Sequence, residues 1–294
     1  MSVTFASAAG LGKACNEDLC GAGTKAAWVL DGASVPPGIA TCCERDAVWY
    51  VHRLADALSS CLAAQPPADL RNVLADAIDA VRREHEATCR RGSGHALGPS
   101  ATVALVRRQE QVLDYLVLGD TAVLLDTGDD VICHSDRRLA QVAAPIREEI
   151  YRRLRRGGGY DSSTHRSLVN RLIEYERMAR NTLGGYWTAS DDPAAAFQAI
   201  TGSYQIGQRP GEVRRLALLT DGAQRAVTHF GTHGSWSALM TALVADGPQA
   251  CIQTVRAAEA VDPDGRRFLR TQPSDDATVL IWDLTRTPDY LGSS

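Results

Sequence analysis

Carboxylates recur in this sequence beside glycine and at the ends of apolar runs, where a β-sheet would present side chains at its rim. They lie in five short patterns, in this order along the chain: Asn16-Glu17-Asp18, Asp31-Gly32, Gly119-Asp120-Thr121, Thr220-Asp221-Gly222 and Asp275-Asp276-Ala277-Thr278. Hard divalent cations such as Mg²⁺ and Mn²⁺ select carboxylate, carbonyl and water oxygens as ligands. Several carboxylates converging from distant segments would therefore form a metal centre.

Taken one at a time, these patterns have plainer explanations. Asn16-Glu17-Asp18 alone is typical of a solvated turn, and Gly119-Asp120 or Gly222 is typical of a hairpin or a helix cap. Asp275-Asp276 could merely begin a strand. The order of all five patterns together is what favours a functional site.

Other chemistries lack a matching pattern. The eight cysteines show no paired C-x-x-C spacing of a structural zinc site, and without a signal peptide they predict reduced thiols. No G-x-S-x-G nucleophile pattern and no P-loop pattern occurs. Gly92, Gly94 and Gly98 follow a helical pattern instead of opening one after a strand, so the dinucleotide fingerprint fails.

Length and composition indicate one enzyme-sized domain. The chain has 294 residues, of which 45% are hydrophobic and 22% charged, enough apolar material for a sizeable core. A net charge of −4 is too small to indicate nucleic acid or a membrane surface as partner. Residues 1–18 lack the pattern of a signal peptide, and no apolar run is long enough to span a bilayer. We expect a cytoplasmic protein.

Apolar periodicity predicts the elements that must position these carboxylates. Period-two apolar runs bounded by turn residues predict six strands: 101–107, 112–118, 121–126, 131–134, 213–219 and 277–284. Short connections between the first four predict an antiparallel meander. Helical spacing predicts helices over 51–62, 70–81, 235–245 and 248–261, and charged helices over 145–180 broken at Gly157-Gly158-Gly159. This order predicts an α+β fold with two sheets and helical outer layers.

The ordered patterns resemble the metal-dependent serine/threonine phosphatases of the PPM family, also called type 2C protein phosphatases, in their bacterial form. The resemblance runs from Gly12 to Trp282 and includes the Gly98-Pro99-Ser100-Ala101-Thr102 segment. It implies a four-layer sandwich of two central antiparallel β-sheets flanked by α-helices, as a single domain over residues 1–294 with a helical insertion or flap around residues 145–210. It also implies two Mn²⁺ or Mg²⁺ ions at one end of the sandwich.

The resemblance assigns a role to each carboxylate. Asp31 would bridge both ions and Gly32 would lend a backbone carbonyl, while Glu17 would bind one ion. Asp221 and Asp275 would bind the other ion.

Three further positions take supporting roles by the same resemblance. Asp18 would orient metal-bound water. Asp120 would bind a weaker third ion that it shares with Asp221. Lys13 stands where the family usually has a phosphate-binding arginine.

Two metal ions would lower the pKa of a bridging water, and the hydroxide could attack phosphorus in line. The resemblance therefore implies hydrolysis of phosphoserine or phosphothreonine in proteins. Two alternatives stay open: a phosphatase for a small phosphorylated metabolite, and a weakly active relative that binds a kinase or regulator. The oligomeric state is not indicated.

The sequence also departs from the family. Ala33 and Ser34 follow the Asp31-Gly32 pair where many members have a histidine, which leaves the general acid unassigned. Lys13 keeps a cation but lacks the planar fork of arginine. Ala122 stands where family members commonly have an arginine after the pattern that corresponds to Gly119-Asp120-Thr121. These departures favour an unusual substrate.

Overall fold

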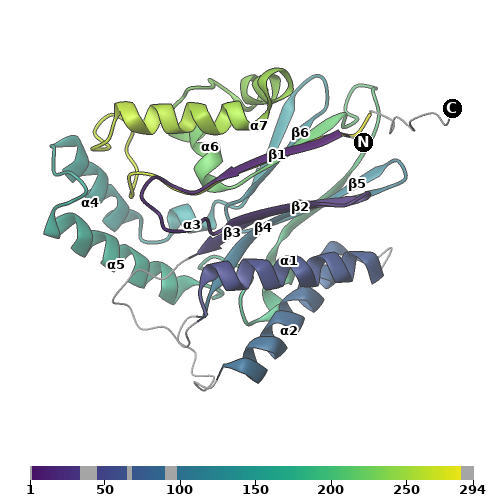
Figure 1. Cartoon of the computed structure of the whole chain (residues 1–294), viewed down its shortest axis with the longest axis horizontal. Coiled ribbons are helices and arrows are strands. Elements are labelled where there is room, and N and C mark those ends of the chain that lie inside the picture. The colour runs from purple at the N-terminus through teal and green to yellow at the C-terminus, as the bar shows by residue number, and fades with distance from the viewer. Residues whose placement is uncertain (1, 34–44, 65–67, 90–97, 286–294) are drawn as a thin grey trace.

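Two antiparallel β-sheets face each other and helices cover their outer faces (Figure 1). The structure is a computed structural model and describes residues 2–33, 45–64, 68–89 and 98–285. The α+β class and the sandwich of two sheets flanked by helices are confirmed.

Each sheet has five strands and joins segments far apart in sequence. The first has the order β1 (Ser2–Ala8), β10 (Ala277–Asp283), β9 (Arg215–Leu219), β6 (Ala122–Asp126) and β7 (Val131–Ser135). The second has the order β2 (Asp18–Ala22), β3 (Ala26–Ala33), β4 (Ser100–Gln109), β5 (Val112–Leu118) and β8 (Ile200–Gln205). All paired strands in both are antiparallel.

Apolar side chains point alternately to the two faces of each sheet, so the core has one layer between the sheets and one between each sheet and its helices. Val29 of β3 and Leu280 of β10 point into the core between the sheets. The neighbouring Leu30 packs outward against helices, as does Val279 on the other sheet. Successive strand residues point to opposite faces, so strands that are buried on both sides read as nearly continuous apolar runs.

Helices form the outer layers. The second sheet is covered by α1 (Ala47–Ala64) and α2 (Leu70–Thr88), and the first by α6 (Asp221–Thr228) and α7 (Trp236–Val261). Gly247 interrupts α7 with a φ of 81°, and Pro248 follows it. The two helices expected at 235–245 and 248–261 are thus the two halves of α7.

A separate helical group lies at the end of the sandwich opposite the N-terminus (Figure 1). It contains α4 (Ala144–Arg155) and α5 (Ser163–Ala179), which pack through a small apolar cluster of their own. The short α3 (Arg138–Gln141) precedes them and the 3₁₀ helix η1 (Pro193–Gln198) follows. The assignment of residues 145–210 as a flap within one domain stays a prediction.

The meander expected from residue 101 to residue 134 is wrong as a single sheet. β4 pairs with β5 in one sheet, whereas β6 pairs with β7 in the other. The chain changes sheets at residues 119–121, where Gly119 adopts a φ of 84°. A short connection between two apolar strands looks the same in sequence whether it closes a hairpin or crosses between sheets.

β8 is a strand that sequence periodicity did not reveal. It lies at the edge of the second sheet beside β5, and its residues alternate between exposed and half-exposed. An edge strand of this kind carries little apolar signal.

Some expectations fall partly or wholly outside the described residues. The glycine-rich segment 90–99 is described only at Gly98 and Pro99, and Cys42 and Cys43 are not described. The six described cysteines are free thiols, as expected for them. Among the described helices, none is both long and apolar enough to cross a membrane; the cytoplasmic location stays a prediction.

Candidate metal centre

Asp18 and Asp31 lie directly opposite each other on the paired strands β2 and β3. Opposed residues of an antiparallel pair project to the same face, so the pairing places two carboxylates together. Burial raises the pKa of Asp31 well above its usual range, and the charges of Asp18, Asp221, Asp120 and Asp275 raise it further. One strand register thus creates the centre of an acidic cluster.

Asp18 is nearly inaccessible, with 5% of its surface exposed. Burial raises its pKa well above the usual range, against hydrogen bonds from Thr220 and Thr278 that lower it. Thr220 Oγ1 donates to Asp18 Oδ2 at 2.8 Å and accepts from the Thr278 backbone N–H at 2.9 Å. Asp18 Oδ1 is buried and has no hydrogen-bond partner among the described residues.

Gly32 lets the end of β3 approach the segment that carries Glu17. Its N–H donates to the Glu17 carbonyl at 3.1 Å. A Cβ at this position would lie 2.7 Å from that carbonyl oxygen and 3.1 Å from Val51 of α1. The glycine beside Asp31 is therefore required by close packing. Burial raises the pKa of Glu17 to about 7, although Lys13 acts to lower it.

Asp120 lies where the chain changes from β5 to β6. Its backbone carbonyl accepts from Gln224 Nε2 at 2.6 Å and from Ser135 Oγ at 3.2 Å, which fixes the corner. Burial and the charge of Asp221 raise the pKa of Asp120 to about 7.

Asp221 begins helix α6, and burial followed by the charge of Asp275 raises its pKa to about 6. The next residue, Gly222, packs so closely on the opposite chain segment that a Cβ there would lie 1.9 Å from the Asp276 carbonyl oxygen. The start of α6, which carries Asp221, therefore packs directly against the segment before β10.

The two adjacent carboxylates before β10 have different surroundings. Asp276 is 3% exposed and accepts from the backbone N–H groups of Gly10 at 2.8 Å and Glu17 at 2.9 Å. It thus anchors the loop between β1 and β2. Asp275 accepts from the side chains of Lys13, Gln272 and Arg225, whereas Lys13 is the side chain that donates to Asp276. The assignment of Asp275, not Asp276, as the ligand stays a prediction.

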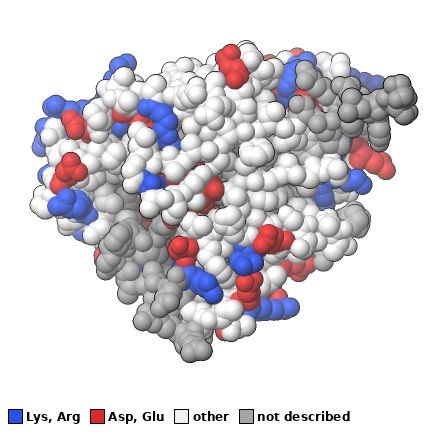
Figure 2. Space-filling view, in the orientation of Figure 1, with Lys and Arg blue, Asp and Glu red and all other residues white. Residues whose placement is uncertain are grey.

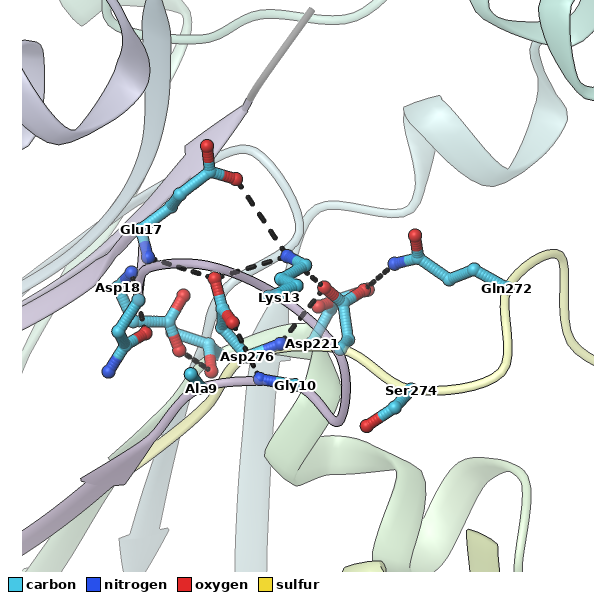
Figure 3. Close-up of polar contacts among 12 residues, drawn as sticks. Ala9, Gly10, Lys13, Glu17, Asp18, Asp221, Gln272, Ser274 and Asp276 are labelled. Carbon is cyan, nitrogen blue, oxygen red and sulfur yellow. Dashed lines mark hydrogen bonds and ion pairs between the residues drawn. The ribbon is translucent and has the colours of Figure 1, made fainter. Parts of the chain in front are cut away.

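Lys13 lies among carboxylates (Figure 3). Its Nζ is 2.9 Å from Asp275 Oδ1, 3.1 Å from Asp276 Oδ2 and 3.7 Å from Glu17 Oε2. Burial acts to lower the pKa of Lys13, but its interactions with Asp275 and Asp276 outweigh this and raise the pKa. The phosphate-binding role implied by the resemblance stays a prediction, because here the ammonium binds acidic side chains.

Sequence reasoning missed Arg225. It lies on α6 one helical turn after Asp221, is 5% exposed, and places Nη2 2.7 Å from Asp275 Oδ2 and 3.9 Å from Asp221 Oδ2. Its Nη1 is buried without a partner among the described residues. The i, i+4 spacing to Asp221 was a visible signal, but the contact with Asp275 joins residues 50 positions apart.

The carboxylates of this acidic cluster have the chemistry that divalent cations bind. Burial and mutual repulsion raise the pKa values of Glu17, Asp18, Asp31, Asp120 and Asp221, and a bound cation would relieve both costs. As the side chains stand, however, no group of three or more Asp, Glu, His or Cys within the described ranges is spaced to hold an ion. The ligand assignments therefore stay predictions.

Acidic and basic side chains are both spread over the face of the molecule shown in Figure 2. A few acidic atoms are also visible between uncharged residues near the middle of that face. The predictions of no nucleic acid and no membrane partner are not tested by this distribution.

Solved structures similar to this chain are bacterial phosphatases. The serine/threonine phosphatase PstP/Ppp of Mycobacterium tuberculosis has a TM-score of 0.55 at 16% identity, covering 96% of this chain and 98% of that chain. MsPP from Mycobacterium smegmatis, a PPM Ser-Thr phosphatase in complex with cacodylate, has a TM-score of 0.53 at 17% identity, covering 97% and 98%. Stp1 from Staphylococcus aureus has a TM-score of 0.54 at 13% identity, covering 96% and 94%. At these identities the likeness shows the fold.

No curated protein matches the chain. The sequence profile of the family described as Protein phosphatase 2C matches residues 12–251, a span that includes Lys13 and Arg225 and ends before Asp275. Because that span is more than half of the 294 residues, this chain belongs to the protein phosphatase 2C family of metal-dependent phosphatases.

Proposed function

We propose that this phosphatase removes phosphate from phosphoserine or phosphothreonine in proteins, with two Mn²⁺ or Mg²⁺ ions bound at the acidic end of the sandwich. The observation that carries the proposal is the pairing of Asp31 with Asp18 at the centre of a cluster that also contains Asp120, Asp221 and Asp275. A structure of the PstP catalytic domain, 15% identical to this chain with a TM-score of 0.51, is described as a complex with 2 manganese ions.

Each carboxylate has a proposed task. Glu17 would hold one ion, Asp221 and Asp275 the other, and Asp31 with the Gly32 carbonyl would contribute between them. Bound there, the ions would neutralise phosphate charge and supply an activated water as nucleophile.

The protein's own groups would orient that chemistry. Asp18, held by Thr220, would accept a proton or a hydrogen bond from the activated water through Oδ1, which has no partner among the described residues. Asp120, with Asp221, would hold a weaker third ion, because a site with few protein ligands and several waters binds weakly.

The test is phosphate release by the chelator-treated protein, with and without added Mn²⁺ or Mg²⁺. The substrates are an aryl phosphate, phosphoserine and phosphothreonine peptides, and a panel of small phosphorylated metabolites. We expect metal-dependent release, fastest from the peptides. Faster release from a metabolite would move the substrate class to small molecules.

A second candidate is a weakly active relative that binds a kinase or regulator. The observation that favours it is the engagement of both Lys13 and Arg225 by the protein's own carboxylates, which leaves fewer cations for substrate phosphate. Metal binding without hydrolysis of any substrate in the panel would support this candidate.

A further inference from the structure

The Asp275 carboxylate is fully used by donors of the protein itself. Its Oδ1 accepts from Lys13 Nζ at 2.9 Å and from the Asp276 backbone N–H at 3.0 Å. Its Oδ2 accepts from Arg225 Nη2 at 2.7 Å and from Gln272 Nε2. A carboxylate has about four lone-pair sites, so Asp275 has none left for an ion in this arrangement.

The two cations that hold Asp275 also reach its neighbours. Lys13 Nζ lies 3.7 Å from Glu17 Oε2, and Arg225 Nη2 lies 3.9 Å from Asp221 Oδ2. Figure 3 shows the contacts of Lys13 with Glu17 and with Asp276 as dashed lines. The half of the centre proposed for Asp221 and Asp275 therefore already contains two positive charges.

Both cations are held in place. The Arg225 side chain is only 6% exposed and projects from α6, and the Lys13 backbone N–H donates to the Gly10 carbonyl at 3.0 Å. Charge pairs that are shielded from solvent are stronger than exposed pairs.

The other half of the centre, made of Glu17 and Asp31, is less neutralised. Lys13 Nζ lies 3.7 Å from Glu17 Oε2 there, compared with 2.9 Å from Asp275 Oδ1. The charges that act most strongly on Asp31 are all acidic, those of Asp18, Asp221, Asp120 and Asp275. An incoming divalent cation near Asp31 meets negative charge, whereas one near Asp275 must first displace an ammonium or a guanidinium.

We infer that Lys13 and Arg225 are internal counter-cations that compete with a divalent ion for Asp275. The ion held by Asp221 and Asp275 then binds more weakly than the ion held by Glu17 and Asp31. The inference rests on the proposed metal centre. Occupancy of the site at Asp221 and Asp275, and therefore activity, would then depend on the metal concentration. Without metal, Lys13 and Arg225 would neutralise the Asp275 carboxylate.

The experiment is a calorimetric titration of chelator-treated protein with Mn²⁺ alone, without substrate. The variants are Lys13→Met and Arg225→Met, with Lys25→Met and Arg209→Met as matched controls at exposed positions. Wild type should show two unequal affinities for the main pair of ions, apart from any weaker third ion at Asp120; below, the weaker ion is the one held by Asp221 and Asp275. Each centre variant should bind the weaker ion about tenfold more tightly, the order of one charge-assisted hydrogen bond, and the controls should match wild type.

Thermal unfolding separates competition from simple damage. In chelator, Lys13→Met and Arg225→Met should melt below wild type because they leave buried carboxylates uncompensated, and excess Mn²⁺ should narrow that gap. Damage to the fold would weaken metal binding, not strengthen it. Lys13→Arg and Arg225→Lys keep the charge and should retain the wild-type difference between the two affinities.

The outcomes distinguish this inference from the proposed function. If wild type binds two ions and the two methionine variants bind them equally well or less well, the competition is refuted and the metal centre stands. If neither wild type nor the variants bind Mn²⁺, the metal centre itself is refuted and this inference fails with it.

Discussion

Asp31 is the residue on which the proposed centre depends most, because it alone would contact both ions. We expect Asp31→Asn to lower metal-dependent hydrolysis of an aryl phosphate by more than about a hundredfold, beyond the usual cost of losing a group that only orients a ligand. Turnover with saturating Mn²⁺ is the measurement. Asp129→Asn, at an exposed acid in the turn between β6 and β7, is the control. An Asp31→Asn protein with near-normal turnover would show that the site is misassigned.

Asp120 tests the weaker third ion. The Asp120→Ala protein should keep both tighter ions and turn over more slowly, with its metal-concentration dependence shifted upward, because only the weakest site loses a ligand. Calorimetric titration combined with kcat measures both effects. Loss of all tight metal binding would instead place Asp120 among the ligands of the main pair.

Thr220 is a residue whose importance only the structure reveals. Its hydroxyl joins Asp18 to the backbone of β10, so Thr220→Val removes a donor from a buried carboxylate and leaves the Thr278 N–H unpaired. We expect a loss of about 1–3 kcal/mol in the free energy of unfolding. Thr220→Ser keeps the hydroxyl and should lose much less. Equal stability of the valine and serine proteins in denaturant titration would contradict this account.

At the scale of elements, the start of α6 must lie against the segment before β10. A Cβ at Gly222 would overlap the Asp276 carbonyl oxygen, whereas a Cβ at Gly234 meets nothing within 4 Å. Gly222→Ala should therefore destabilise the fold by about 1–3 kcal/mol, as overpacking does, and reduce turnover by displacing Asp221. Gly234→Ala should do neither. Thermal unfolding and kcat of the two alanine proteins decide the matter; similar values would mean that α6 has room to shift.

Sequence predicted the elements that carry local signals and missed the contacts that depend on distant partners. The apolar run before Asp31 and the helical spacing around Val73 are local features, and the expected strand and helix are present. The contact of Lys13 with Asp275 joins residues 262 positions apart, and no local pattern reports it. The sheet crossing at Gly119 was missed for a related reason, because partner choice is decided by the whole sandwich.

The centre was predicted as a set of residues but not as an arrangement. The sequence showed glycines beside Asp31 and Asp221 but gave no reason for them, and the structure explains Gly32 and Gly222 by close packing. The competing cations were not foreseen, since the resemblance assigned Lys13 to substrate phosphate and no local pattern pairs Lys13 or Arg225 with Asp275. Ion pairing across the fold depends on tertiary geometry that periodicity does not contain.

At the scale of the whole molecule, stability without metal should depend on pH. The folded protein holds Glu17 and Asp120 with pKa values of about 7, well above their ordinary values of 4.5 and 3.8. Between these limits the folded state binds protons that the unfolded chain has released, so stability is highest at low pH in this window and is lost as pH rises toward 7. The Tm in chelator should therefore fall from pH 5 to pH 8.

Bound Mn²⁺ should reverse that trend, because metal binding requires ionised carboxylates and competes with protons. Calorimetry at four pH values, with chelator or with Mn²⁺, provides the comparison. A Tm in chelator that stays level or rises from pH 5 to pH 8 would show that these carboxylates are not held protonated by the fold.

Among the described residues, the first strand pairs with the last. β1 lies beside β10 from Ser2 opposite Asp283 to Ala8 opposite Ala277, and Asp275 lies two residues before β10. During synthesis on a ribosome, β1 can therefore pair with β10 only after residues 277–283 have been synthesised. Contacts between residues so far apart in sequence slow folding. A chain released before residue 277 would lack the strand in the middle of three, so β1 and β9 would be left without a shared partner. The pairing of β10 with β1 is thus also what brings Asp275 and Asp276 to the loop that carries Lys13 and Glu17, so the proposed centre depends on the pairing of the two ends of this sheet.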